Sequence, residues 1–177
     1  MMTTAKSNYK STPPNDSQDS DSFDIEGLKE ALNNSANESI SNLTHAQIKR
    51  AKNDILQKLQ IKGDALKTMH ARLIGYRYID NDCDNGNDRV RVGEYVRWIS
   101  LKSPGQLVLT NGAYVCNAYE MLDPSDPHSA YIRCKISRGG GGGSSTRFFN
   151  LNMAENVIFQ KITYQEWIIL DALDHLK

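Results

Sequence analysis

The spacing of hydrophobic positions divides the 177-residue chain into a polar leader, a helical region and a strand-rich region. Residues 1–23 are almost free of apolar side chains, so they bury too little surface to offset their chain entropy and are expected to be disordered. Asp24 precedes apolar residues at helical spacing: Ile25, Leu28, Ala31 and Leu32. This pattern favours a short helix that needs a partner surface. Residues 1–43 are therefore interpreted as an acidic, disordered leader whose 24–34 segment orders on binding.

A longer helix is predicted over residues 45–61. Thr44 and Gln47 have the spacing of a capping box, in which hydroxyl and amide satisfy the first free backbone groups of a helix. One apolar stripe follows at helical spacing: Ile48, Ala51, Ile55, Leu56 and Leu59. Gly63 is the expected stop signal, so residues 44–70 are interpreted as a helix and a linker.

From residue 71 onward the hydrophobic period changes from that of a helix to that of a strand. Seven short strands are predicted, at 71–79, 89–101, 106–110, 113–122, 131–137, 147–151 and 157–162. Asn111-Gly112 is the strongest hairpin signal among the turns. Several short strands separated by turn signals are typical of an antiparallel barrel or sandwich.

The strand region is too short for an immunoglobulin-type sandwich, which favours a small SH3-like or OB-like antiparallel barrel. A second capping box, Thr163 with Glu166, begins an apolar helix over residues 163–176 that should pack on the barrel or on a partner. The predicted fold class is thus mainly β (α+β). A barrel domain over 71–177 is flanked by an N-terminal and a C-terminal helix and preceded by a disordered tail.

Composition narrows the function classes. The 21 basic and 21 acidic side chains balance, so no overall field drives the chain onto nucleic acid or membrane. No apolar run is long enough to span a bilayer, and the first 24 residues lack a secretory signal. Three widely spaced cysteines indicate neither a disulfide framework nor a zinc pair. A cytoplasmic location is therefore expected.

Three patterns that carry chemistry in other proteins are interpreted as structural here. Asp80, Asp82, Asp84 and Gly86 look like a calcium loop, but the sixth and twelfth positions of an EF-hand are Asn85 and Arg91. The glycine run 139–143 lacks the Gly-Lys-Ser/Thr of a phosphate loop and is interpreted as a flexible connection. No histidine neighbours a nucleophile in a recognisable motif. We predict no catalytic residue, no metal and no cofactor, and hence no enzyme.

Aromatic and basic residues interleave on the predicted strands, which is the best remaining candidate for a functional surface. Such a surface can stack nucleic-acid bases and track phosphates, cage a methylated cation or bind a protein. The alternative in which most rings are core or barrel surface remains open for each ring. The candidate nucleic-acid-binding residues are Arg91, Tyr95, Arg97, Tyr131, Arg133, Lys135, Arg138 and Arg147.

Four segments carry a resemblance to a known group of proteins. They are Gly75-Tyr76-Arg77-Tyr78, Val92-Gly93-Glu94-Tyr95-Val96-Arg97-Trp98-Ile99, Asn111-Gly112, and Ile158-Phe159-Gln160-Lys161-Ile162-Thr163 before a helix containing Glu166. Together they resemble small uncharacterised β-rich proteins of large nucleocytoplasmic DNA viruses, over roughly residues 70–175. The resemblance implies a viral protein made in host cytoplasm and carried in the virion, and it transfers no functional residue.

The expected function is a non-enzymatic structural or interaction module, such as a minor virion component. Its expected partner is another protein or a second copy of the chain, with no membrane and no small-molecule substrate. The alternative is a small β-barrel that binds nucleic acid through the outer Arg/Tyr face. Under that alternative, replacing Arg97 weakens binding to all sequences alike, because a phosphate contact carries no sequence information.

Overall fold

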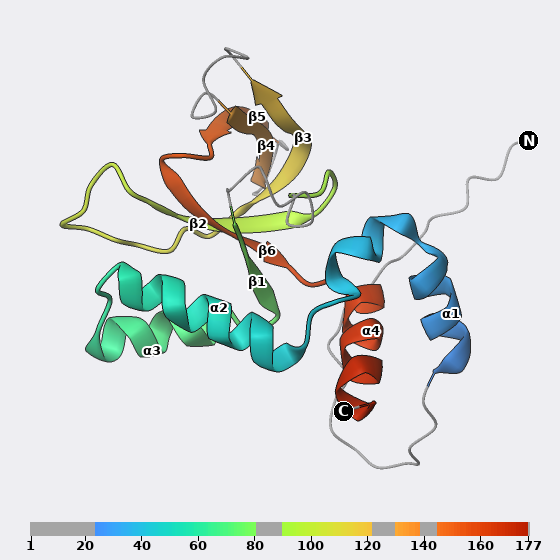
Figure 1. The fold of residues 1–177 in the computed structure, drawn as a ribbon. Coiled ribbons are helices and arrows are strands. Elements are labelled where there is room, and N and C mark those ends of the chain that lie inside the picture. The colour runs from blue at the N-terminus through green and yellow to red at the C-terminus, as the bar shows by residue number, and fades with distance from the viewer. Residues whose placement is uncertain (1–23, 81–89, 122–129, 139–144, 177) are drawn as a thin grey trace, which may run out of the picture.

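The protein is an α+β structure in which one antiparallel sheet is packed with helices, as the computed structural model shows (Figure 1). Residues 24–80, 90–121, 130–138 and 145–176 are described. The helices are α1 (Ile25–Asn33), the 3₁₀ helix η1 (Ser35–Ile40), α2 (His45–Lys58), α3 (Gly63–Arg72) and α4 (Tyr164–His175). The strands are β1 (Tyr76–Ile79), β2 (Tyr95–Ser100), β3 (Ala113–Met121), β4 (Ala130–Arg138), β5 (Ser145–Asn152) and β6 (Asn156–Lys161). The interpretations of residues 1–23, of the Asp82–Asp84 turn and of the glycine run fall outside this range.

Both predicted capping boxes are present, so the two long helices begin where expected. The side chain of Thr44 accepts a hydrogen bond from the backbone N–H of Gln47. The side-chain oxygen of Gln47 in turn accepts one from the backbone N–H of Thr44. Thr163 and Glu166 make the same reciprocal pair at the start of α4. These patterns satisfy backbone groups within one helical turn, which is why the sequence alone specifies them.

The predicted linker before residue 70 is wrong, because residues 63–72 form α3. Gly63, the expected stop signal, is the first residue of that helix. The reversal between the two helices is made by Gln60, whose φ is +57°, after the last turn of α2. Helix α3 then buries Met69 against the same hydrophobic cluster as Leu56 of α2. This shared burial stabilises a pair of helices where periodicity indicated one.

The expectation of a disordered leader fails for its second half. Asp24 caps α1 through a hydrogen bond from the backbone of Gly27, and α1 is followed directly by η1. Ala31 and Ile40 are buried with Ile169 and Leu170 of α4. In Figure 1, α1 and α4 lie side by side. The partner surface that this short helix needs is thus supplied by the C-terminal helix of the same chain.

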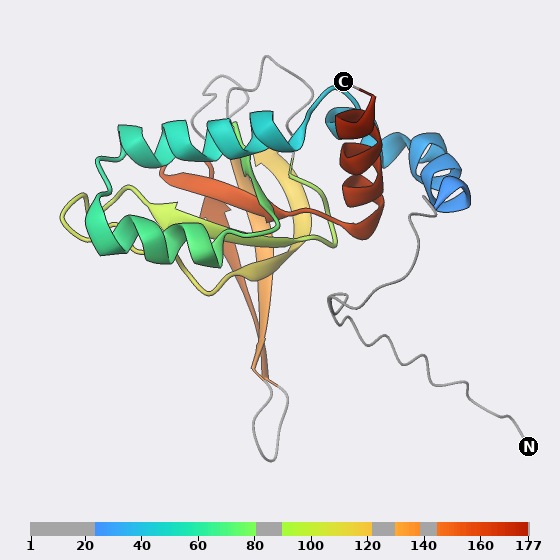
Figure 2. The ribbon, with the colours of Figure 1, turned by 90° about the horizontal axis from the view of Figure 1, so that it is seen from below.

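The sheet does not close into a barrel, so the SH3-like or OB-like prediction is corrected to an open six-stranded sheet. The strand order is β1-β6-β2-β3-β4-β5, and neighbouring strands are antiparallel. Closure would require β1 to pair with β5. However, β1 has only four residues and packs beside α2, while β4 and β5 extend away from the helices as a long ribbon (Figure 2).

Asn111-Gly112 is not a hairpin tip, and residues 106–110 are not a separate strand. Leu109 pairs with Ile99 of β2, and Ala113 pairs with Val96 of the same strand. One stretch of chain therefore follows β2 throughout, and its register shifts by one residue at positions 111–112. The reversal lies earlier, where the backbone N–H of Gln106 donates to the carbonyl of Ser103 over 2.9 Å. The turn propensity of Asn111-Gly112 is therefore expressed as an irregularity in the pairing with β2 and not as a hairpin.

Each face of the sheet has its own hydrophobic cluster. One face, here called the inner face, buries Ile79, Val96, Ile132, Cys134 and Ile158 together. The ring centroids of Trp98 in β2 and Phe149 in β5 are 5.6 Å apart on this face, although two strands separate β2 from β5. The sheet is therefore strongly coiled. The opposite face, here called the helix face, buries side chains of β1, β2 and β6 beneath α2 and α3: Tyr76, Ile99, Val157 and Phe159.

Helices α2 and α3 cover only half of the helix face. Over β3, β4 and β5 that face carries exposed side chains, among them Tyr114 and Phe148. None of the helices that the structure describes combines the length and apolar character required to cross a lipid bilayer. The part of the helix face formed by β3, β4 and β5 is called its open half.

Candidate functional site

A line of directly paired residues crosses the open half of the helix face. Tyr95 of β2 pairs with Tyr114 of β3, Tyr114 with Lys135 of β4, and Lys135 with Phe148 of β5. Directly paired residues of an antiparallel sheet point to the same face, about 5 Å apart. We call these four residues the cross-strand row. Along the row, two tyrosine rings are followed by the lysine and then by the phenylalanine ring.

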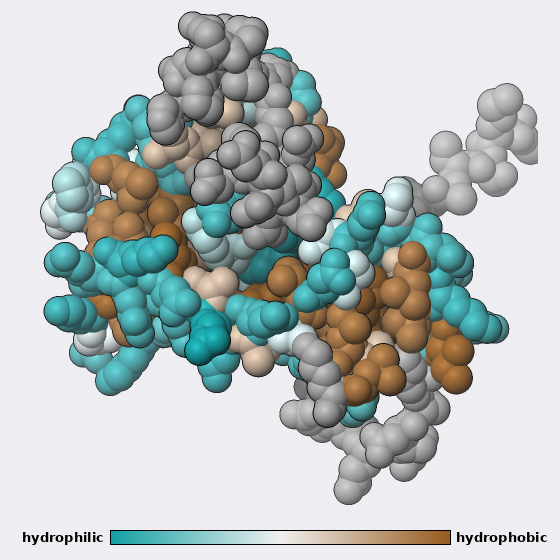
Figure 3. All heavy atoms as spheres, in the orientation of Figure 1, coloured by the Kyte–Doolittle hydropathy of each residue, from teal (hydrophilic) through white to brown (hydrophobic). Residues whose placement is uncertain are grey.

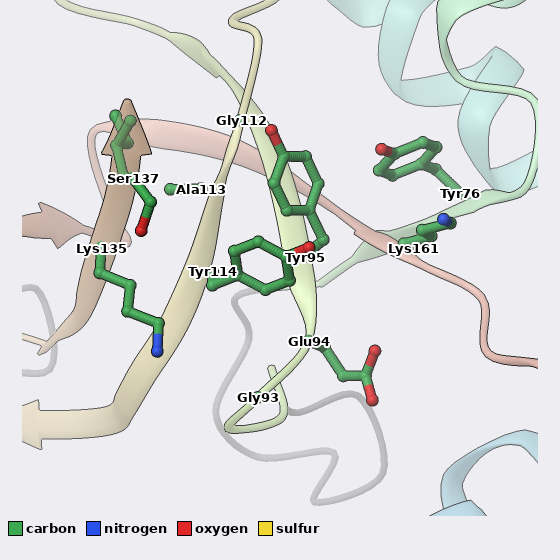
Figure 4. Close-up of a pocket in the computed structure, with 11 residues that line it drawn as sticks. Tyr76, Gly93, Glu94, Tyr95, Gly112, Ala113, Tyr114, Lys135, Ser137 and Lys161 are labelled. Atoms are coloured by element: carbon green, nitrogen blue, oxygen red, sulfur yellow. The ribbon is translucent and has the colours of Figure 1, made fainter. Parts of the chain in front are cut away.

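A groove lies along the first part of the row (Figure 4). Its volume is about 570 Å³, and its polar and aromatic lining comprises Tyr76, Glu94, Tyr95, Tyr114, Lys135, Ser137 and Lys161. Tyr76 and Lys161 are paired residues of β1 and β6, so the groove continues the row toward the helices. Two ammonium groups line the groove, and Glu94 is the one acidic side chain among its described lining residues.

The rings in the groove are held by contacts with neighbouring elements. Tyr95 and Tyr114 meet edge to face with their ring centroids 4.8 Å apart. The hydroxyl of Tyr95 donates to the carbonyl of Asn111 over 3.0 Å, at the register shift of the neighbouring strand. Tyr114 is 48% exposed, so its side chain remains partly open to solvent and to a ligand. Tyr95 thus positions Tyr114 at the mouth of the groove.

Beyond Lys135 the row ends in a shallow pocket of about 350 Å³. Phe148, which is 53% exposed, lines it together with Tyr131, Arg133 and Asn150. The guanidinium carbon of Arg133 lies 5.5 Å from the centre of the Phe148 ring, within the range of a cation–π contact. Arg133 and Asn150 are themselves directly paired, so they stand side by side on the helix face.

The pKa of Glu94 is shifted by its surroundings. Burial raises the pKa of Glu94 above the ordinary glutamate value, although the nearby Arg91 guanidinium opposes the shift. Glu166 adds to the increase and Lys161 opposes it. A protonated Glu94 would leave the lysines as the charged side chains of the groove, so acid favours an anionic ligand here.

Arg91, predicted to lie on an outer basic face, belongs instead to a buried network. Its guanidinium is ion-paired with Glu166, which is fully buried, and also donates to the carbonyl of Ala36 over 2.7 Å. The backbone N–H of Arg91 donates to the side chain of Gln160 over 2.8 Å. Strand alternation placed Arg91 outside, but its segment is a turn before β2, where alternation does not apply.

Arg97 was also predicted to lie on the outer basic face, but it points to the helix face and makes contacts within the fold. Its guanidinium donates to the carbonyl of Arg72 at the end of α3 and lies 5.0 Å from the centre of the Tyr76 ring. Arg97 therefore anchors α3 to β2. The weakened binding expected for Arg97→Ala would now follow from a changed fold, so Arg97 no longer serves to test phosphate contact.

The other predicted residues divide between the two faces of the β4–β5 ribbon. Tyr131, Arg133 and Lys135 lie together on the helix face, in or beside the row. Arg147 is exposed but pairs with Ile136, which places it on the opposite face. Arg138 is in β4, and its side chain is outside the described part of the chain.

Sequence reasoning missed Phe148, Asn150, Lys161 and Glu94 as members of a site. It counted Tyr114 among the interleaved aromatic residues of the strands but not among the nucleic-acid-binding candidates. Each of these residues lies in or beside a predicted strand, so the secondary structure was available. The missing information was the pairing, since β6 inserts between β1 and β2 and brings Lys161 to the groove. Among the described residues, no three His, Cys, Asp or Glu side chains gather in a way that could hold a metal ion.

The chain was compared with protein-family models, with curated proteins and with solved structures, and none of the three comparisons found a match. The resemblance to proteins of large DNA viruses accordingly stays a prediction.

Proposed function

We propose that the protein is a binding module without a catalytic step, and that the cross-strand row binds nucleic acid. The observation that carries this proposal is the register that sets Tyr95, Tyr114, Lys135 and Phe148 in one line on an open sheet face. Aromatic rings on a sheet stack bases, and cations between them neutralise phosphates. Lys161 and Arg133 extend the positive charge at the two ends of the line.

The balanced charge of the chain is compatible with this proposal because the basic groups are concentrated locally. Arg133, Lys135 and Lys161 are exposed, and none of them forms a salt bridge with a described acidic residue. Glu94, the acid in the groove, has a raised pKa. A polyanion approaching this face therefore meets cations that are not held in a salt bridge with a described acidic residue.

The test is fluorescence anisotropy of a labelled DNA oligonucleotide titrated with the full chain at low and at physiological salt. Binding should weaken linearly in a double-logarithmic plot against salt, because each neutralised phosphate releases counterions. Lys135→Ala should reduce affinity and lower the salt slope by roughly 1. Lys58→Ala removes another exposed lysine, from α2, and serves as the matched control. Equal losses in the two variants would show that the row is not the binding face.

A second candidate is the structural or interaction module, for example a minor virion component. One observation favours it: apolar side chains remain exposed on α1 and α4, where hydrophobic atoms gather in Figure 3. Ile25 and Leu32 of α1 and Tyr164 of α4 are each more than half exposed. Self-association measured by sedimentation would support this candidate, and its loss in Leu32→Asp would assign the contact to α1.

A further inference from the structure

The cross-strand row has two separate ring platforms, and their spacing bears on the kind of nucleic acid it can hold. Tyr114 and Phe148 lie on opposite sides of Lys135, one strand away from it in each direction. Two strand spacings amount to about 10 Å. Stacked bases in a duplex are only about 3.4 Å apart. Two successive bases can therefore reach the two platforms only if they are unstacked from each other.

The chemistry at each platform suits a separated base. Tyr114 offers a ring that Tyr95 supports from the side at 4.8 Å between centroids. Phe148 offers a ring whose centre lies 5.5 Å from the guanidinium carbon of Arg133. Asn150, the residue paired with Arg133, adds an amide that can form hydrogen bonds. Lys135 between the platforms has three N–H donors and no acceptor, which matches the phosphate that joins two nucleotides.

We infer that the row selects single-stranded nucleic acid, with the backbone running across the strands and passing Lys135 between one base on Tyr114 and the next on Phe148. This inference rests on the proposed function and deepens it. In a duplex the faces of the bases are covered by their neighbours, so neither ring could stack without unwinding the helix. A single strand exposes those faces, and stacking on aromatic side chains tolerates any base.

The orientation follows from the shape of the surface. The groove is lined at the helix end of the row by Tyr76, which is buried beneath α2 and α3, while the shallow pocket at Phe148 lies on the β4–β5 ribbon. A nucleic-acid strand entering over β5, at the edge of the sheet, would pass Phe148, Lys135 and Tyr114 in that order and end near Lys161. The groove therefore provides a second phosphate contact at the far end of the row.

The experiment compares three labelled ligands of equal length with the full chain at low salt: oligothymidylate, the corresponding duplex and an abasic oligomer that keeps the phosphates. Oligothymidylate should bind more tightly than both others by at least roughly fivefold, the lower limit for one stacked base. Tyr114→Ala and Phe148→Ala should each weaken oligothymidylate binding roughly 5- to 150-fold. The same variants should leave abasic binding unchanged.

Two further variants separate stacking from damage to the fold. Tyr114→Phe keeps the ring and should bind oligothymidylate as the unmodified chain does. Tyr164→Ala removes a ring that is 71% exposed on α4. Tyr164 is not part of the cross-strand row and lines neither of its two hollows, so this variant should bind as the unmodified chain does. Equal affinity for all three ligands would overturn the single-strand inference while leaving nucleic-acid binding intact. Absence of binding to every ligand would overturn both.

Discussion

The guanidinium of Arg91 is ion-paired with the carboxylate of Glu166, which lies 75 residues later in the chain and is fully buried. The same carboxylate caps α4 by accepting the backbone N–H of Thr163 over 2.7 Å, and it lies 3.7 Å from Arg77 of β1. Arg91 also reaches the carbonyl of Ala36 in η1. One buried charge thus connects the C-terminal helix, the N-terminal helices and the sheet.

Replacing Glu166 with glutamine should destabilise the fold strongly. Glutamine can keep the capping hydrogen bond but removes the negative charge that Arg91 and Arg77 face in a buried site. Breaking a buried pair by removing one partner typically costs about 3–5 kcal/mol. Urea denaturation followed by circular dichroism measures the free energy of unfolding.

Glu155→Gln is the matched control, because it breaks the exposed ion pair between Glu155 and Lys102, which are 2.8 Å apart. An exposed pair is worth about 0–1 kcal/mol, so this change should be close to neutral. Similar losses in the two glutamine variants would contradict the assigned role of the buried pair.

The position of Glu166 illustrates what the sequence could and could not reveal. Its capping box with Thr163 involves residues within one turn and was predicted correctly. Its pairing with Arg91 depends on the docking of α4 against the sheet, for which no local pattern exists. The same limit applies to the site: Tyr95 and Lys135 were selected as candidates, but Tyr114 and Phe148 were recognisable as their neighbours only once the strand register was known.

The open sheet has a related cause. Strand lengths and turn signals suggested a closed barrel, because the predicted strands were short and separated by turn signals. Closure, however, is decided by which strands lie at the edges. The C-terminal strand β6 enters between β1 and β2, leaving the four-residue β1 at one edge and β5 at the other. Nothing in the spacing of residues 156–161 indicates that position.

Glu94 should make both stability and binding depend on pH. Burial raises the pKa of Glu94 above its ordinary value of 4.5, so the folded chain binds this proton more tightly than the unfolded chain does. The contribution of Glu94 therefore favours folding at acid pH, and it is lost as pH rises from the ordinary value through the raised one. Glu94→Gln should gain stability relative to the unmodified chain over that interval, as measured by urea denaturation at a series of pH values.

The same variant tests the electrostatics of the groove. With its acidic lining residue neutralised, the groove should bind oligonucleotide more tightly at neutral pH, and the difference from the unmodified chain should shrink as pH falls. Asp64→Asn changes an exposed acid at the start of α3 and controls for net charge. A pH profile that is identical with and without Glu94 would show that this carboxyl does not titrate in the interval.

Cys134 should resist alkylation in the folded chain. It is fully buried on the inner face, and burial raises the pKa of its thiol to about 12, so almost no reactive thiolate is present at neutral pH. Cys116 is only partly buried and provides an internal comparison. Iodoacetamide followed by peptide mass spectrometry should modify Cys116 first and Cys134 only after denaturation. Equal modification of Cys134 with and without denaturant would contradict its burial.

Gly112 should tolerate no side chain, because the register shift brings it against β2. Its φ is +105°, and a Cβ atom would lie 2.5 Å from both the carbonyl oxygen of Val96 and the Tyr95 ring. Gly112→Ala should therefore destabilise the fold by about 1–3 kcal/mol or more through backbone strain, with the collision added. It should also displace the Tyr95 ring and weaken oligonucleotide binding.

Two other glycines separate the strain from the collision. Gly93 has a φ of +90°, but a Cβ atom added there would meet open space, so Gly93→Ala should show the strain without the collision. Gly105 has open space and no positive φ, so Gly105→Ala should be nearly neutral. The denaturation midpoint should be highest for Gly105→Ala, lower for Gly93→Ala and lowest for Gly112→Ala. If Gly112→Ala matched Gly93→Ala in stability and in binding, the close approach of Gly112 to Tyr95 would play no part in shaping the row.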